Sequence, residues 1–187
     1  MILTDREIQI ALDQQLIRID PPPNGDAYSS TSIDLTLGST ISVFSALTDG
    51  LYQEVDPGSD GFQPASVIKA LTTTQDIDGG GFLLQPGELV LAWTKEKVGL
   101  DLKAKIAARV EGKSSLARFG IAVHITAPTI HAGFSGLIQL EVINHGRVPL
   151  RLRPGMKFCQ LIFEQTLGTP AKGYKGRFYE QDSELFN

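Results

Sequence analysis

The stretch LIQLEVI at residues 137–143 alternates apolar and polar side chains with the period of two that is typical of a β-strand. Its polar members, Gln139 and Glu141, share one face of that strand. The opposite face is apolar and carries Ile138, Leu140 and Val142. A strand with one polar and one apolar face predicts a sheet that packs on one side against a core.

Similar strands are indicated on both sides of this stretch. Alternating apolar residues recur at Leu35, Leu37, Ile41 and Val43; at Leu89, Leu91 and Trp93; at Ile106, Ala108 and Val110; at Ile121, Val123 and Ile125; and at Val148, Leu150 and Leu152. A last strand, at about 158–163, is apolar almost throughout. Many short strands, with 19 Gly and 10 Pro between them, predict a mainly β fold, an antiparallel sandwich or barrel. Residues 45–82 lack regular apolar alternation, so we expect a long connecting segment there with one short strand or helical turn.

A short helix is predicted at the N-terminus. Thr4 and Glu7 have the spacing of a capping box, in which each side chain accepts a free backbone N–H of the first turn. An apolar stripe at helical spacing follows, formed by Ile8, Ala11 and Leu12. The prolines at 21–23 stop any regular element.

The composition bounds the class of protein. The chain has 187 residues, the length of one domain, of which 42% are hydrophobic and 20% charged. Its net charge of −4 argues against a general nucleic-acid binder, and no run reaches the ~18 apolar residues of a membrane span. Cys159 is the single cysteine, so an intrachain disulfide and a multi-cysteine zinc site are excluded. A reducing, cytoplasmic setting fits this cysteine count.

Glu141 is the first candidate for chemistry. A carboxylate in mid-strand between apolar neighbours is partly desolvated, and desolvation raises the pKa of a carboxyl toward the range useful for proton transfer. The alternative is an ordinary solvent-facing position on the sheet, which is commoner for a lone Glu.

The segment EGKSSLAR at 111–118 follows a predicted strand and is expected to open a short helical turn. It is a candidate phosphate site. Its small residues expose backbone N–H groups, and Lys113, Ser114, Ser115 and Arg118 add hydroxyl and cationic donors. The G-x-x-x-x-G-K-[ST] spacing of a Walker A loop is absent. A capped helix start with solvated charges explains the same residues equally well.

Other polar residues and one loop allow several interpretations. The zinc deaminase pattern H-x-E…P-C-x-x-C is missing, so metal binding through protein ligands alone is not expected. His145 is predicted in a surface turn and Cys159 as a buried thiol. Asp34, at the entry of a strand, is predicted as a turn or capping acid. Phe134, in the Gly-flanked loop 130–136, either stacks on a sugar or base or plugs the core.

Six segments together resemble the dCTP deaminase branch of the dUTPase superfamily. In family order they are TSIDLTLG (31–38), QPGELVLAWT (85–94), EGKSSLARFG (111–120), VHITA (123–127), GFSGLIQLEVIN (133–144) and LRPGMKFCQLIFE (152–164). The resemblance implies a dUTPase-like distorted β-barrel or jelly roll with a short N-terminal helix, assembled as a homotrimer with active sites between subunits. Residues 1–171 would form this single domain, and residues 172–187 an arm that closes over the nucleotide.

The resemblance also implies an activity. Such enzymes replace the 4-amino group of dCTP by oxygen and release dUTP and ammonia without zinc. Mg²⁺ accompanies the triphosphate rather than binding a protein cage. The resemblance makes dTTP a candidate feedback inhibitor, and it implies neither nucleic acid nor membrane as a partner.

Site roles carry over by position. Glu141 matches the catalytic glutamate, which takes a proton from the attacking water and passes it to the leaving nitrogen. Ser114 and Arg118 match the residues that position this water and stabilise developing charge. The other matches bind substrate. The main chain at Thr126 and Ala127 orients the water and reads the base, and Lys113 and Ser115 hold phosphates. The remaining substrate contacts are Phe134, Gln139 and His131, with Tyr174, Arg177 and Gln181 in the closing tail. His124 and Asp34 match structural or switch positions.

His131 departs from the family pattern. Members commonly have an Asp here that contacts the deoxyribose 3′-hydroxyl and, in dUTPases, helps activate the water that attacks the α-phosphate. Pro128 also stands where bifunctional members often carry Gly. The alternatives are therefore a bifunctional enzyme that continues to dUMP and pyrophosphate, a non-catalytic nucleotide-binding regulator, and an enzyme for a 5-substituted dCTP.

Overall fold

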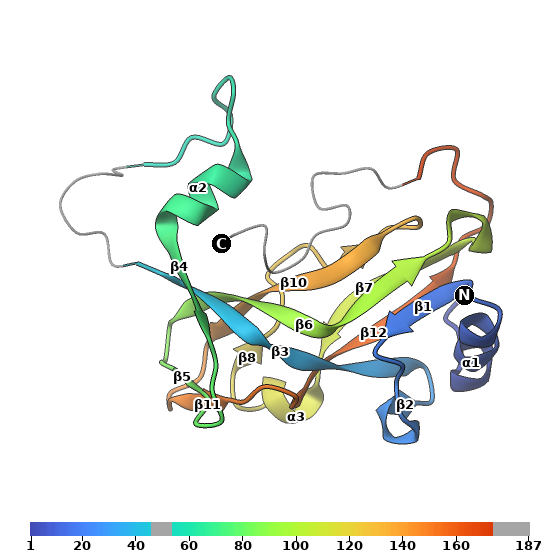
Figure 1. The fold of residues 1–187 in the computed structure, drawn as a ribbon, viewed down its shortest axis with the longest axis horizontal. Helices are drawn as coiled ribbons and strands as arrows, with labels where there is room; N and C mark the ends of the chain where they lie inside the picture. The colour runs from blue at the N-terminus through green and yellow to red at the C-terminus, as the bar shows by residue number, and fades with distance from the viewer. Residues whose placement is uncertain (46–53, 174–187) are drawn as a thin grey trace.

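A computed structural model describes residues 1–45 and 54–173, which form a mainly β structure (Figure 1). Its helices are α1 (Asp5–Asp13), α2 (Pro64–Leu71) and α3 (Ser114–Ala117), with 3₁₀ turns at Gly25–Ala27 and Leu102–Ala104. Its strands are β1 (Ile17–Asp20), β2 (Tyr28–Ser29), β3 (Ser32–Phe44), β4 (Thr72–Asp76), β5 (Phe82–Leu84), β6 (Leu89–Leu100), β7 (Ile106–Gly112), β8 (Ile121–Ala122), β9 (Thr129–Ile130), β10 (Ser135–Asn144), β11 (Leu150–Leu152) and β12 (Lys157–Gln165).

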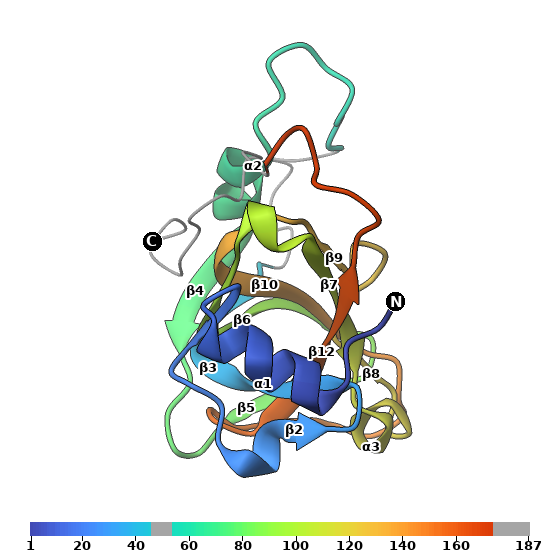
Figure 2. The same cartoon turned by 90° about the vertical axis from the view of Figure 1, so that its right-hand side faces the viewer.

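One ten-stranded antiparallel sheet makes up most of the described structure. Its main path runs β8-β10-β6-β3-β12-β7-β9, with β1 added to β6 and both β2 and β4 added to β3, while β5 and β11 pair separately. Figures 1 and 2 show the sheet curling round, with α1 packed at one end. The predicted mainly β, barrel-like fold with a short N-terminal helix is confirmed.

The curl depends on β3, which belongs to both halves of the sheet. Its first part pairs with β12 and its second part with β6. Between Leu37 and Ile41, β3 advances four residues while its partners on β6 advance two, so β3 bulges and bends. Gly38 lies in this bulge, where a Cβ would stand only 3.0 Å from the Trp93 carbonyl oxygen. The absence of a side chain at Gly38 therefore lets the two strands approach each other.

The core lies inside the curl and follows the predicted alternation. β10 contributes Ile138, Leu140 and Val142, none of which is more than 3% exposed. α1 adds the buried side chain of Ile8, and its start is fixed by the predicted capping box, in which Thr4 donates its N–H to the Glu7 carboxylate at 2.9 Å. The apolar strand predicted at 158–163 is the buried centre of β12.

Two predicted strands are shorter than their sequence patterns suggest. The strand predicted at 121–125 extends only over Ile121–Ala122, which pair with Ile143 and Asn144 of β10, and Ile125 is 54% exposed. β11 begins at Leu150 and leaves Val148 exposed. Apolar alternation alone cannot show where a pairing partner ends.

The face assigned to β6 also needs correction. The core side chains of this strand include Val90 and Ala92, rather than the predicted alternating set that contains Leu91 and Trp93. Leu91 and Trp93 lie on the other face and are nevertheless buried, at 5% and 1% exposure. A strand that is buried on both faces has no single apolar period to read.

The region predicted as irregular contains more structure than one short element. Residues 54–82 include both α2 and β4, while 46–53 lie outside the described residues. The patterns also do not predict β1, β2, β5 or β9, because strands of two to four residues are too short to show a period. None of the helices in the described ranges has the length and apolarity needed to cross a membrane.

Candidate functional site

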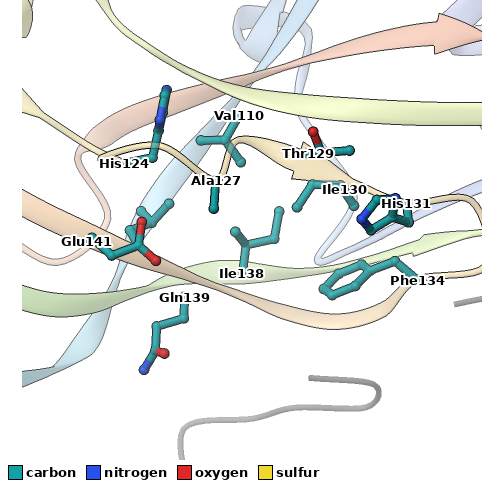
Figure 3. Close-up of a pocket in the computed structure, with 11 residues that line it drawn as sticks. Val110, His124, Ala127, Thr129, Ile130, His131, Phe134, Ile138, Gln139 and Glu141 are labelled. Carbon is teal, nitrogen blue, oxygen red and sulfur yellow. The ribbon is translucent and has the colours of Figure 1, made fainter. Parts of the chain in front are cut away.

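A cavity of about 240 Å³ lies beside β10 (Figure 3). Among the described strands, β8 covers this edge of β10 only at Ile143 and Asn144, so the preceding residues have an unpaired edge. The segment 124–131 passes along that edge and closes the cavity. The lining residues are Val110, His124, Ala127, Thr129, Ile130, His131, Phe134, Ile138, Gln139, Leu140 and Glu141.

Backbone hydrogen bonds fix both walls of the cavity. Val110 donates its N–H to the Pro128 carbonyl oxygen at 2.8 Å, next to the pairing of β9 with β7. The loop before β10 turns at Gly133, whose φ of 86° disfavours residues with a side chain. Just beyond this turn, Leu100 donates its N–H to the Phe134 carbonyl oxygen at 2.9 Å. The cavity is therefore framed by hydrogen-bonded strand ends.

Glu141 stands at one end of the cavity beside His124, and Phe134 stands at the other end (Figure 3). The Glu141 side chain is half-buried, and its partner across the β6 ladder is the buried Leu91. Within residues 1–45 and 54–173, the Glu141 carboxylate has no hydrogen-bond or ion-pair partner. A carboxylate in this position is available to exchange protons with a bound molecule.

Two residues that line the cavity have buried polar atoms that lack partners in the described ranges. Gln139 and Glu141 share a face of β10, as predicted, and both line the cavity. The Nε2 of Gln139 and the Nδ1 of His124 are buried without a hydrogen-bond partner in the described part of the chain. An unsatisfied buried polar atom costs about 1–3 kcal/mol, and most other lining residues are apolar. A cavity with mostly apolar walls and a carboxylate at one end suits a small ring-shaped ligand.

Phe134 packs in the core, as one of its two interpretations predicts, and its stacking on a sugar or base stays a prediction. It is 5% exposed, belongs to the core cluster and also lines the cavity. His131 is exposed at the same end of the cavity (Figure 3). Ala127 lines the cavity, whereas Thr126 is exposed and lies outside the lining set.

α3 carries the predicted phosphate-binding residues apart from this cavity. The predicted helical turn forms, and its Ser114, Ser115 and Arg118 are exposed and outside the lining set of the cavity. Figures 1 and 2 show α3 at the lower edge of the molecule. The segment ends at Gly120, where a Cβ would meet the Gly146 nitrogen at 2.2 Å. This close approach fixes the end of the α3 segment against the turn after β10.

Lys113, at the start of α3, is tied to β3 and β12. Its ammonium group pairs with the carboxylate of Asp34, whose side chain is 6% exposed, and Lys157 lies 3.5 Å from the second carboxylate oxygen. Gln160 donates its amide N–H to the Gly112 carbonyl oxygen at 3.1 Å. Asp34 is therefore a buried ion-pair acceptor within β3, and its prediction as a turn or capping acid was wrong. Sequence patterns gave no signal for Lys157 or Gln160.

The remaining predicted residues fall in three groups. Cys159 is a buried thiol, as predicted, and burial, with smaller effects from Glu96 and Asp34, raises its pKa, so the thiol stays protonated. His145 is exposed just after β10, as predicted. Three residues of the predicted tail lie outside the described residues: Tyr174, Arg177 and Gln181. In the described ranges, no three His, Cys, Asp or Glu side chains gather as a metal site requires.

Comparisons with known proteins give a consistent picture. A family model described as dCTP deaminase-like matches residues 2–166. The curated dCTP deaminase of Shewanella amazonensis is 42% identical over 178 residues, which cover 95% of this chain and 90% of that protein. The dCTP deaminase of Rhodospirillum rubrum is 39% identical over 175 residues, which cover 93% and 87%.

Solved structures share the fold. A crystal structure of 2′-deoxycytidine 5′-triphosphate deaminase from Agrobacterium tumefaciens gives a TM-score of 0.66 at 22% identity over 88% of this chain. The match spans 48% of that protein's chain. A Staphylococcus bacteriophage 80alpha dUTPase gives a TM-score of 0.51 at 10% identity, covering 86% of this chain and 96% of that chain. At these identities the likeness concerns the fold alone.

We expect Asp34→Asn to lower the free energy of unfolding by about 2 kcal/mol, because hydrogen bonds to charged groups contribute about 1.5–3 kcal/mol. The control is Lys157→Gln, whose side chain is 44% exposed and more distant from Asp34, and which we expect to lose less than about 1 kcal/mol. Urea unfolding at pH 7 measures both values. If both variants lost the same free energy of unfolding, the ion pair with Lys157 would account for the whole effect of Asp34. Lys113 would then not be the main partner of Asp34.

Proposed function

This chain belongs to the dCTP deaminase family, and on that premise we propose that it converts dCTP and water to dUTP and ammonia. The observation that carries the proposal is the half-buried Glu141 carboxylate, which has no partner among the described residues and lies in a cavity of mostly apolar walls. The cavity has the character of a nucleoside site, and β10 holds the acid at one end of it. Supply of dUTP for pyrimidine deoxynucleotide metabolism is the corresponding role.

Glu141 acts as the general base and acid in the proposed reaction. It takes a proton from a water molecule as the water oxygen bonds to C4 of the cytosine ring. One water proton is transferred to ring N3 and the other to the 4-amino group. The C4–N4 bond then breaks, ammonia leaves, and C4 becomes a carbonyl. The single group works in both directions because it is regenerated at the end of the cycle. The mechanism requires no zinc.

Ser114 and Arg118 are proposed to complete the site from a neighbouring subunit. Their exposure on α3, apart from the cavity that holds Glu141, supports a site between subunits of a homotrimer. There the hydroxyl would position the water, and the guanidinium would stabilise charge developing around the base. In the same arrangement, the main chain at Thr126 and Ala127 would orient the water and the base.

The triphosphate is proposed to lie toward α3. Ser115 and Lys113 are proposed to donate hydrogen bonds to its phosphate oxygens. When Lys113 leaves Asp34 to bind a phosphate, Lys157 can pair with the Asp34 carboxylate in its place. Magnesium arrives with the triphosphate, whose oxygens are the ligands that it prefers. The residues proposed to close over the nucleotide are Tyr174, Arg177 and Gln181, in an arm that begins at residue 172 after a domain of residues 1–171.

Other properties stay predictions. His124 is proposed as a structural or switch residue, and His131 with Phe134 as the contacts at the nucleoside end. Feedback inhibition by dTTP and a cytoplasmic location are proposed from the family resemblance alone.

Product analysis tests the proposed function directly. After incubation with dCTP and magnesium, we expect chromatography to show dUTP and ammonia in equal amounts and no dUMP. The reason is that His131 replaces the Asp expected to assist α-phosphate attack. Formation of dUMP and pyrophosphate would show that the chain also cleaves dUTP, and unchanged dCTP would contradict deamination.

We expect Glu141→Gln to lower turnover of dCTP at least about 100-fold, because a general acid–base group typically contributes 10²–10⁴-fold. Nucleotide affinity, measured by calorimetry, should stay within a few-fold because the shape of the cavity is kept. Glu54→Gln is the control, since Glu54 is exposed and outside the cavity lining. Turnover within about tenfold of the unaltered chain would rule out the assigned role.

Subunit complementation tests the shared site. Arg118→Ala and Glu141→Gln chains are each expected to be nearly inactive, but random mixed trimers should regain about a quarter of full activity, because a quarter of the sites then pair two intact residues. Chains mixed after unfolding and refolded together provide the measurement, and each variant refolded alone is the control. No recovery in the mixture would place both residues in the same subunit's site.

A further inference from the structure

Two lysines share one buried carboxylate beside α3. The Asp34 side chain is 6% exposed, and its Oδ1 accepts a hydrogen bond from the Lys113 ammonium group. The Lys157 ammonium group lies 3.5 Å from Oδ2 of the same carboxylate. Lys157 is also the less buried of the two cations, with its side chain 44% exposed against 21% for Lys113. One negative charge therefore faces two positive charges, one of which is in excess.

A bulge in β12 brings Lys157 to the face of the sheet that carries Asp34. Gln160 pairs with Asp34 across the β12–β3 ladder, and Lys157 pairs with Thr36, so β12 takes three residue steps where β3 takes two. Side chains alternate between the two faces of a strand, so a regular β12 would point Lys157 away from the face of Gln160 and Asp34. The extra residue in β12 reverses this orientation.

Lys157 has a second partner and space in which to move. Its ammonium group donates a hydrogen bond to the Asp26 carbonyl oxygen, in the 3₁₀ turn Gly25–Ala27. A cavity of about 370 Å³ borders both Lys157 and Asp34. The Lys157 side chain can therefore shift from its present position to a closer ion pair with Asp34 without displacing the core.

Departure of Lys113 from Asp34 has a cost. Removal of one partner from a buried ion pair is strongly destabilising, because the remaining charge is left buried and uncompensated. Under the proposed function, a phosphate group must compete with Asp34 for the Lys113 ammonium group. A second cation that moves onto Asp34 lowers the cost of this exchange, although it touches no part of the nucleotide.

We propose that Lys157 is a positioning residue for nucleotide binding, which takes over the Asp34 carboxylate when Lys113 leaves it and thereby strengthens the hold of Lys113 on the triphosphate. The inference rests on the proposed function, which places the triphosphate at Lys113. The phosphates do not change during deamination, so this effect is equal for substrate and transition state. Lys157 therefore acts on KM rather than on kcat.

The test compares Lys157→Met, which removes the charge but keeps an unbranched side chain, with Lys157→Arg, which keeps the charge. Lys95→Met is the matched control, because Lys95 is exposed, borders the same cavity and loses the same charge. Calorimetry measures the affinity for dCTP in a Glu141→Gln background, which we expect to bind dCTP without turning it over. The value of kcat is measured with Glu141 intact, and thermal melting checks that each variant folds.

We expect Lys157→Met to weaken dCTP binding about tenfold, less than the roughly hundredfold effect of removing a fully buried partner, because Lys157 is partly exposed. The value of kcat stays within about twofold. Lys157→Arg and Lys95→Met keep the affinity for dCTP within about threefold. Deoxycytidine carries no phosphate, so its inhibition constant is the same with and without Lys157→Met.

Asp34→Asn separates this role from a direct contact between Lys157 and phosphate. Without the buried charge of Asp34 there is nothing for Lys157 to compensate, so adding Lys157→Met to Asp34→Asn leaves the affinity for dCTP unchanged. A tenfold loss that persists in this background would show a direct contact and overturn the proposal. An unchanged affinity in Lys157→Met alone, or an equal loss in Lys95→Met, would overturn it as well.

Failure of this inference is distinguishable from failure of the proposed function. In the first case the unaltered chain still releases ammonia from dCTP, and only the comparison of lysine variants disagrees. In the second case the unaltered chain releases no ammonia from dCTP.

Discussion

The alternation of side chains along β10 is the constraint on which the site depends. Burial of Ile138, Leu140 and Val142 in the core forces Gln139 and Glu141 onto the other face. A slip of one residue in the pairing with β6 would exchange the two faces and bury the acid in the core. β6 bulges between Lys97 and Trp93, where the Thr94 hydroxyl accepts the Ile138 N–H at 3.0 Å, and this bulge pins the register. The same apolar contacts that stabilise the fold therefore place the acid in the cavity.

Features that depend on local periodicity could be predicted from the sequence. The capping box of Thr4 and Glu7, the faces of β10 and the helical turn after Gly112 each need only a few consecutive residues. The choice of Glu141 as the reacting acid needed more than its own strand, because an exposed sheet position explains a lone Glu as well. The combination of six segments favours that role through family resemblance, and the cavity beside β10 is consistent with it.

Features that depend on distant pairing could not be predicted. Asp34 and Lys113 are 79 positions apart in the chain, so no periodic pattern links them, although their ion pair holds the start of α3. β8 pairs with only two residues of β10, whereas the apolar alternation of its sequence continues to Ile125, so the pattern does not mark where pairing ends. The burial of the Gln139 Nε2 without a partner in residues 1–45 and 54–173 is likewise a property of the tertiary structure, since a Gln in a strand is ordinarily read as solvent-facing.

The separation of Ser114 and Arg118 on α3 from Glu141 in the cavity affects how the enzyme responds to its own concentration. Under the proposed function, an isolated chain carries two half-sites and no complete one. Activity per mole of protein is then not a constant. It falls on dilution below the dissociation constant of the assembly and recovers when the chains are concentrated, as mass action requires. Substrate that bridges two chains would oppose this loss, so dilution in the presence of nucleotide would preserve activity longer than dilution in buffer.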